Sequence, residues 1–118
     1  LDVLETGLAQ AIPVGSGTWV LTVTIPGGPQ VGDNPFVLTV HSMAGPLSFS
    51  EVAALSVTIT PTMPDMGHGS TGNVDPVFTE DGRYEGLLVF SMGGAWEVEF
   101  ALSDGAGIEA AATFAIDV

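Results

Sequence analysis

The chain has 118 residues with 14 acidic side chains, one arginine and no lysine, so its formal net charge is −13. Such a surface repels phosphate backbones and anionic lipid headgroups, which argues against nucleic acid and membrane insertion. The chain has no cysteine, which excludes disulfides, thiolate metal sites and cysteine nucleophiles. With 46% hydrophobic residues, we expect one domain over residues 1–118.

Taken in chain order, the first 14 residues are interpreted as an edge strand or a mobile arm. After them, apolar and polar residues alternate with a period of two in several short segments, which is typical of strands with one buried face. These segments cover residues 18–25, 36–41, 55–60, 83–91, 96–103 and 108–118.

Turn signals separate the segments. Pro26-Gly-Gly-Pro29 ends the first clear strand, Asp33-Asn-Pro35 introduces the next, and Gly93-Gly94 and Asp104-Gly105 indicate hairpins. Residues 49–55 allow one helical turn at most. The pattern therefore predicts an all-β fold, an immunoglobulin-like antiparallel β-sandwich of two sheets and about seven strands.

One segment, residues 61–76, shows no strand pattern and is predicted to be a long loop, which in a compact domain is often functional. It contains Met63, Met66 and His68 within six residues. Thioether sulfur is a soft, neutral ligand that suits Cu(I), and imidazole binds copper in either oxidation state. The spacing Met-x-x-Met-x-His lets one turn direct all three side chains inward.

A fourth ligand is expected from Met92, which stands before the Gly93-Gly94 turn. Its parity in the strand predicts that it points to the apolar side, beside Trp96. A second pair, His41 and Met43, either completes this site or forms a separate weak one.

Structural roles explain the same residues in a different way. Met63 and Met66 would then form a hydrophobic lid over one end of the sandwich, and His68 would fix the turn through hydrogen bonds. Met92 would pack in the core beside Trp96. Both interpretations remain open from the residues alone.

Several motifs together resemble the YtkA-like/FixH-like family of bacterial extracytoplasmic domains, over residues 17–118. The resemblance rests on Thr-Met63-Pro-Asp-Met66-Gly-His68-Gly, on Asp81-Gly-Arg-Tyr84, and on Phe90-Ser-Met92-Gly-Gly-Ala-Trp96. Residues 42–51 depart from the usual turn of the family, with Met43-Ala-Gly-Pro46 in its place, so the resemblance assigns no role to His41 or Met43.

The resemblance implies a β-sandwich outside the cytoplasm with a role in copper binding, and it makes Met63, Met66, His68 and Met92 the candidate ligands. The function expected is therefore a periplasmic or cell-surface Cu(I) chaperone or buffer, exported by a signal segment that is then removed. Its expected partners are a copper ion and a copper-trafficking protein. Enzymatic activity is not expected, because the chain lacks lysine, cysteine and recognisable catalytic motifs.

An alternative function needs no metal. An immunoglobulin-like structural, adhesion or accessory module would bind a protein partner, and the Met/His loop would only pack on its body. A Cu(I)-dependent rise in melting temperature favours the copper function, whereas its absence together with an apolar patch on an exposed sheet favours the module.

Overall fold

A computed structural model describes residues 7–14, 17–45, 48–51, 55–64, 66–79, 83–105 and 107–118. Ten strands and no helix are present in these ranges. They are β1 (Gly7–Val14), β2 (Gly17–Thr24), β3 (Gly32–Gly45), β4 (Ser48–Glu51), β5 (Ser56–Met63), β6 (His68–Gly69), β7 (Val74–Phe78), β8 (Arg83–Phe90), β9 (Ala95–Ser103) and β10 (Glu109–Asp117).

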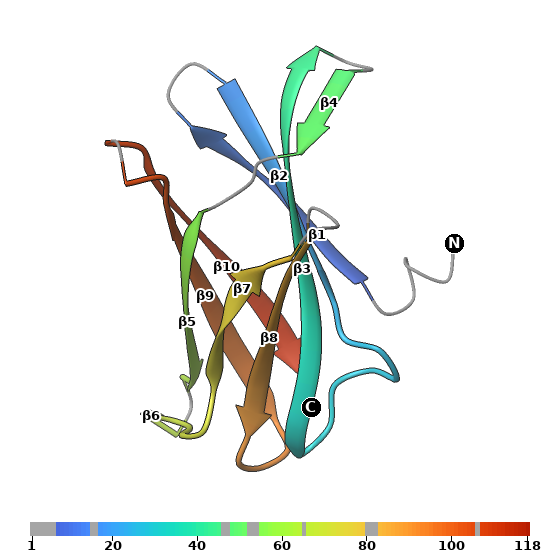
Figure 1. The fold of residues 1–118 in the computed structure, drawn as a ribbon. Helices are drawn as coiled ribbons and strands as arrows, with labels where there is room; N and C mark the ends of the chain where they lie inside the picture. Colours follow the sequence, from blue (N-terminus) through green and yellow to red (C-terminus); the bar gives the residue numbers. More distant parts are fainter. Residues whose placement is uncertain are drawn as a thin grey trace.

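The strands form two antiparallel sheets (Figure 1). The larger sheet has the order β1-β2-β3-β8-β7, with β4 paired to the end of β3, and the smaller has the order β10-β9-β5-β6. At the two seams of the sandwich, β1 lies near β10 and β7 lies near β5. The predicted all-β, two-sheet antiparallel sandwich is confirmed.

The core fills the space between the sheets with every second side chain of each strand. On β9 the alternation is complete, because Trp96, Val98, Phe100 and Leu102 are buried while the residues between them are exposed. The Phe100 ring packs edge-to-face against two other rings. Its centroid lies 5.8 Å from that of Phe36 in the other sheet and 5.5 Å from that of Phe114. Aromatic pairs of this geometry add to the burial of their area.

Tyr84 is a buried polar anchor on β8. Its hydroxyl oxygen accepts a hydrogen bond from the Leu55 N–H at 3.1 Å, which ties β8 to the residue before β5 in the other sheet. Burial raises the pKa of the Tyr84 hydroxyl above 10.0, and this hydrogen bond partly opposes the rise.

The main differences from the predicted strands concern short elements. The segment expected as a loop, residues 61–76, contains the end of β5, all of β6 and the start of β7, so that prediction is wrong in part. Strands of two to five residues are too short for a period of two to be recognised. Asp33-Asn-Pro35 lies within β3 rather than in a turn, and the Asn34 side chain bonds the Gln30 and Gly32 backbone there.

At the start of the chain, residues 7–14 form β1, an edge strand that pairs with β2, and residues 1–6 lie outside the described part. The sequence pattern allowed one helical turn in residues 49–55. Residues 48–51 instead form β4, and residues 52–54 also lie outside the described part. Within the described ranges, no helix is long and apolar enough to cross a bilayer.

Candidate metal site at the methionine end

A tight turn follows β5 and carries two of the four candidate ligands. The Met63 carbonyl accepts hydrogen bonds from the N–H groups of Met66, at 3.1 Å, and Gly67, at 2.9 Å. Pro64 presets the first turn position, and Gly67 has a φ of 68°, a conformation that glycine adopts without strain. The chain then returns as β6, where His68 is the register partner of Met63.

Met63 points into the sandwich at the end of β5. The buried positions of this strand alternate through Val57, Ile59, Pro61 and Met63, and only 5% of the Met63 surface is exposed. Thr62 pairs with Glu97, so the register places Met63 beside Trp96 on the inner face of the smaller sheet. This position agrees with the structural reading of Met63 as part of a hydrophobic lid.

The Met63 methyl group also reaches the hairpin between β8 and β9. A Cβ atom built on Gly94 would lie 2.6 Å from the Met63 Cε atom, so a larger residue at position 94 would have to displace the Met63 methyl group. Gly94 follows Met92 by two residues. The turn after β5 and the β8–β9 hairpin therefore meet at one end of the sandwich, the lower end in Figure 1.

Met92 lies on the outside of this hairpin. The Trp96 indole N–H donates a hydrogen bond of 3.0 Å to the Met92 carbonyl oxygen. The Trp96 ring packs on the Phe90 ring, with 5.1 Å between the ring centroids. The Met92 side chain is 39% exposed, so the prediction that it points to the apolar side is wrong. The alternation ends with β8 at Phe90, because residues 91–94 bend away from the strand.

Two further contacts hold the methionine end in place, and sequence patterns did not identify either. Gly94 exchanges two backbone hydrogen bonds with Val118, of 2.9 and 2.8 Å, which fix the hairpin to the last described residue. Asn73 bonds the Val89 N–H at 2.7 Å through its Oδ1 atom and the Ser70 carbonyl at 3.2 Å through its Nδ2 atom. Asn73 thus fastens the segment after β6 to β8.

The predicted ligands therefore differ in their surroundings. Met63 is buried, whereas Met66, at 56% exposure, and Met92 are open to solvent. The backbone of His68 is described, but its side chain lies outside the described part. Thioethers are soft donors, and two of the three on these turns are accessible from solvent.

His41 lies at the other end of the molecule. Its register partners are Val20 of β2 and Glu51 of β4. It lies nine residues along β3 from Gly32, which pairs with Phe90 at the end of β8 where the β8–β9 hairpin begins. Nine strand residues span on the order of 30 Å. His41 therefore cannot complete the site at the methionine end, and the Met43 side chain lies outside the described part.

Carboxylates provide no metal site in the described part of the chain, where no three His, Asp or Glu side chains are grouped to hold an ion. Asp75, one of the acids near the predicted loop, has a structural role. Its Oδ1 atom accepts a 2.9 Å hydrogen bond from the Ile59 N–H, which caps the edge of β5 that faces β7. This bond satisfies one backbone N–H of the β5 edge, which is a group that an exposed edge would offer to another chain.

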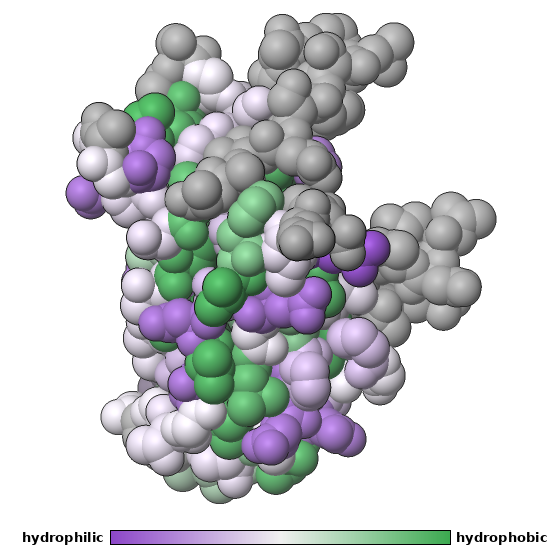
Figure 2. Space-filling model, in the orientation of Figure 1, coloured by the Kyte–Doolittle hydropathy of each residue, from purple (hydrophilic) through white to green (hydrophobic). Residues whose placement is uncertain are grey.

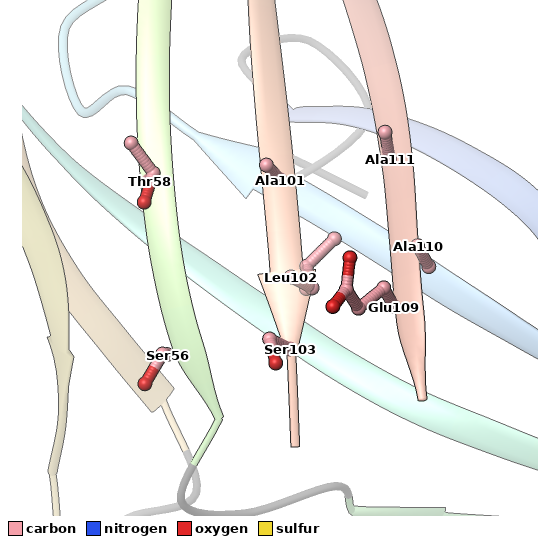
Figure 3. A pocket seen from close by; sticks show the side chains of 8 residues that line it. All are labelled: Ser56, Thr58, Ala101, Leu102, Ser103, Glu109, Ala110 and Ala111. Atoms are coloured by element: carbon pink, nitrogen blue, oxygen red, sulfur yellow. The ribbon is translucent and has the colours of Figure 1, made fainter. Parts of the chain in front are cut away.

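One hollow on the smaller sheet is remote from the two methionine turns. It has a volume of about 410 Å³ and lies on the outer face of the smaller sheet, at the end where Ser103 precedes the β9–β10 turn (Figure 3). Small side chains such as Ala101 and Ala111 line it, and Glu109 is its one charged group. This set offers little for catalysis or for metal binding.

Comparisons with known proteins point to a family. Residues 13–101 match the profile of the family described as YtkA-like. A search of curated proteins finds no match.

Among the solved structures that share the fold are two of FetP from uropathogenic Escherichia coli strain F11. The as-isolated protein has 13% identity and a TM-score of 0.60, over 95% of this chain and 95% of that chain. A copper-bound glutamate-to-glutamine variant has 14% identity and a TM-score of 0.58, over 96% of this chain and 91% of that chain. Together with the family match over most of its length, the sandwich identifies this chain as a member of the YtkA-like family.

Proposed function

We propose that this chain is an extracytoplasmic copper-binding domain that buffers or carries Cu(I), and that it is not an enzyme. The single observation that carries the proposal is the contact between Met63 and Gly94, because it joins the Met63–Met66 turn to the hairpin of Met92. Three of the four methionines in the chain belong to these two turns.

The donor chemistry supports copper in its reduced state. Thioethers are neutral and soft, so they favour Cu(I) over Ca²⁺ or Mg²⁺, and His68 would add a borderline ligand from the register position opposite Met63. Met66 and Met92 are open to solvent, which suits a carrier that passes its metal to a trafficking protein.

The relatives support the same function. The family is YtkA-like, and among structures of the same fold is a copper-bound variant of FetP. FetP was also produced in the periplasm, which supports a place outside the cytoplasm for this chain.

The decisive experiment is an anaerobic Cu(I) titration against a chromogenic chelator in ascorbate. Replacing Met63, Met66 or Met92 by leucine keeps the apolar volume and removes the sulfur, at a small cost in stability. We expect each substitution to weaken Cu(I) binding about tenfold, which is about 1.4 kcal/mol. Met43→Leu, which changes the remaining methionine, is the matched control and is expected to bind as the wild type does.

A thermal scan separates this function from the metal-free module. Cu(I) that binds only the folded state raises the melting temperature of the wild type, and the Met63→Leu/Met66→Leu variant should lose that rise. If the wild type binds Cu(I) no more tightly than this double variant, the copper function is wrong.

A further inference from the structure

The outer face of the larger sheet carries an apolar patch that the copper function does not use. On β8, Tyr84, Leu88 and Phe90 point into the core, so Leu87 and Val89 face outward, both half-buried. The register places further apolar residues beside them on both neighbouring strands. We call this set the apolar outer patch: Val74 and Val77 of β7, Leu87 and Val89 of β8, and Pro35 and Val37 of β3.

The patch is continuous across three strands. Leu87 pairs with Pro35 on one side and with Val74 on the other, and Glu85 pairs with Val37 and Val77 in the next outward row. Val74 is 51% exposed and Val77 is 66% exposed. Figure 2 shows the apolar surface as a band over β7 and β8. Contiguous apolar surface of this kind marks an interaction site more often than isolated apolar residues do.

The other outer face of the sandwich gives a contrast within the same molecule. There the outward positions of β5, β9 and β10 are serine, threonine, alanine, glutamate and aspartate, as in Thr58, Glu97, Ala101 and Asp117. Outward apolar side chains larger than alanine are therefore found on the larger sheet and not at the outward positions of β5, β9 and β10.

Charges around the patch limit what can cover it. Glu85 is exposed in the row between Val37 and Val77, at one edge of the patch, and Asp33, the register partner of Val89, is exposed at the opposite edge. Arg83 is exposed two residues before Glu85 on the same face of β8, so two acidic groups and one cation border the patch along these strands. A second copy of a chain with a net charge of −13 would bring like charges together, and anionic lipid would do the same. A protein partner with an apolar centre and lysine or arginine opposite Glu85 and Asp33 satisfies both features.

A hollow beside the patch extends the surface. It has a volume of about 390 Å³, and Val37 belongs to both the hollow and the patch. Thr22, Thr24 and Thr39 line it together with Pro26 and Arg83, so a polar side chain of a partner finds hydroxyl donors and acceptors and one cationic donor there.

We propose that the apolar outer patch docks a protein partner whose contact surface is apolar at its centre and cationic at its rim. This goes beyond copper binding and does not depend on it. The patch also lies close to the methionine end, since Val89 precedes Met92 by only three residues. A partner seated on the patch is therefore within reach of the exposed methionines.

The test uses a capped eight-residue peptide of alternating valine and lysine as the probe, with a valine–glutamate peptide as its counterpart. Titration is followed by amide shifts in ¹⁵N spectra of the metal-free protein. We expect the largest shifts in β7, β8 and the β8-facing part of β3 with the lysine peptide, and none with the glutamate peptide. Shifts spread over both outer faces, or equal binding of the two peptides, overturn the proposal.

Charge reversal supplies the matched variants. Glu85→Lys and Glu97→Lys change the net charge equally, but Glu85 borders the patch and Glu97 lies on the other outer face. Loss of one close surface charge pair lowers affinity about fivefold. Glu85→Lys should therefore weaken binding of the lysine peptide about fivefold, and Glu97→Lys should weaken it much less. Equal losses would mean attraction by net charge alone, and the proposal would be wrong.

The apolar contribution has its own pair of variants. Val77→Thr/Leu87→Thr removes apolar surface with residues that strands accept, and Ala101→Ser/Ala111→Ser makes a similar change on the other outer face. Only the first pair should weaken binding of the lysine peptide, and equal binding by both overturns the proposal. Thermal scans of both pairs check that the fold is retained.

Two other occupants of the patch, a second copy of this chain and a lipid surface, are tested with the same variants. Concentration-dependent dimerisation that Val77→Thr/Leu87→Thr abolishes would assign the patch to a second copy. Binding to phosphatidylcholine vesicles that the same variant abolishes would assign it to lipid, and either result overturns the proposal. Cu(I) affinity should be unchanged in Glu85→Lys, so a failed peptide experiment leaves the copper function standing and a failed copper titration leaves the patch standing.

Discussion

The contact between Met63 and Gly94 makes a quantitative prediction for Gly94→Ala. The new Cβ would lie 2.6 Å from the Met63 Cε atom, whereas carbon atoms in contact rest at about 3.5–4.0 Å, so the methyl group must retreat by about 1 Å. Residue 94 also has a φ of 138°, which costs a non-glycine residue about 1–3 kcal/mol. Displacing the Met63 side chain from its rotamer adds about 0.5–1.5 kcal/mol.

We therefore expect Gly94→Ala to lower the free energy of unfolding by about 2–4 kcal/mol, measured by urea denaturation with tryptophan fluorescence. In a domain of this size, that corresponds to a melting temperature lower by about 8–16 °C. Gly93→Ala is the matched control. Its Cβ would lie 3.3 Å from the Val118 carbonyl oxygen, and residue 93 has no positive φ, so its loss should be smaller.

A double-mutant cycle separates the two causes. In a Met63→Ala background the methyl group is absent, so Gly94→Ala should cost less there by about 0.5–1.5 kcal/mol. Equal costs in both backgrounds would refute the contact, and a loss below about 0.5 kcal/mol for Gly94→Ala alone would refute the backbone argument as well.

Two further predictions concern residues that hold the methionine end and the core. Tyr84 is the only tyrosine, and there is no lysine or cysteine, so it dominates titration at alkaline pH. Because its folded-state pKa is raised, the unfolded chain loses this proton first, and the free energy of unfolding should fall as pH rises above about 10. Tyr84→Phe should abolish that fall in urea denaturation curves, and an unchanged slope would contradict the assignment. Asn73→Ala leaves the Val89 N–H without its side-chain acceptor and should lower the free energy of unfolding by about 1–3 kcal/mol. Hydrogen exchange of the Val89 amide should become faster in this variant. Unaltered exchange would show that the bond is not maintained in solution.

The fold was predictable because its long strands alternate clearly. On β9 and β10 the inward and outward residues separate almost without exception. The short strands β4, β6 and β7 were not predicted, since two to five residues carry too little periodicity. Their pairing is imposed by neighbours that are distant in sequence, such as β8 for β7.

The candidate site was predictable as a set of residue types and only partly as an arrangement. The Met63–Met66 turn and its meeting with the hairpin of Met92 follow the expectation. The burial of Met63 continues the alternation of Val57 and Ile59 in β5, whereas the exposure of Met92 does not follow from parity. Parity applies only within a strand, and Met92 stands two residues after the end of β8. The roles of Asn73 and Val118 depend on tertiary pairing that no local pattern encodes.

The topology explains why the two methionine turns meet at all. β5 and β9 are neighbours in the smaller sheet and run antiparallel, so the end of β5 lies beside the start of β9. The start of β9 is also one arm of the β8–β9 hairpin, and β8 belongs to the larger sheet. The hairpin therefore connects the two sheets across the end of the core at which Met63 and Trp96 are buried. This strand order, together with the close approach of Gly94 to Met63, brings the segment that carries Met92 near the last inward residue of β5.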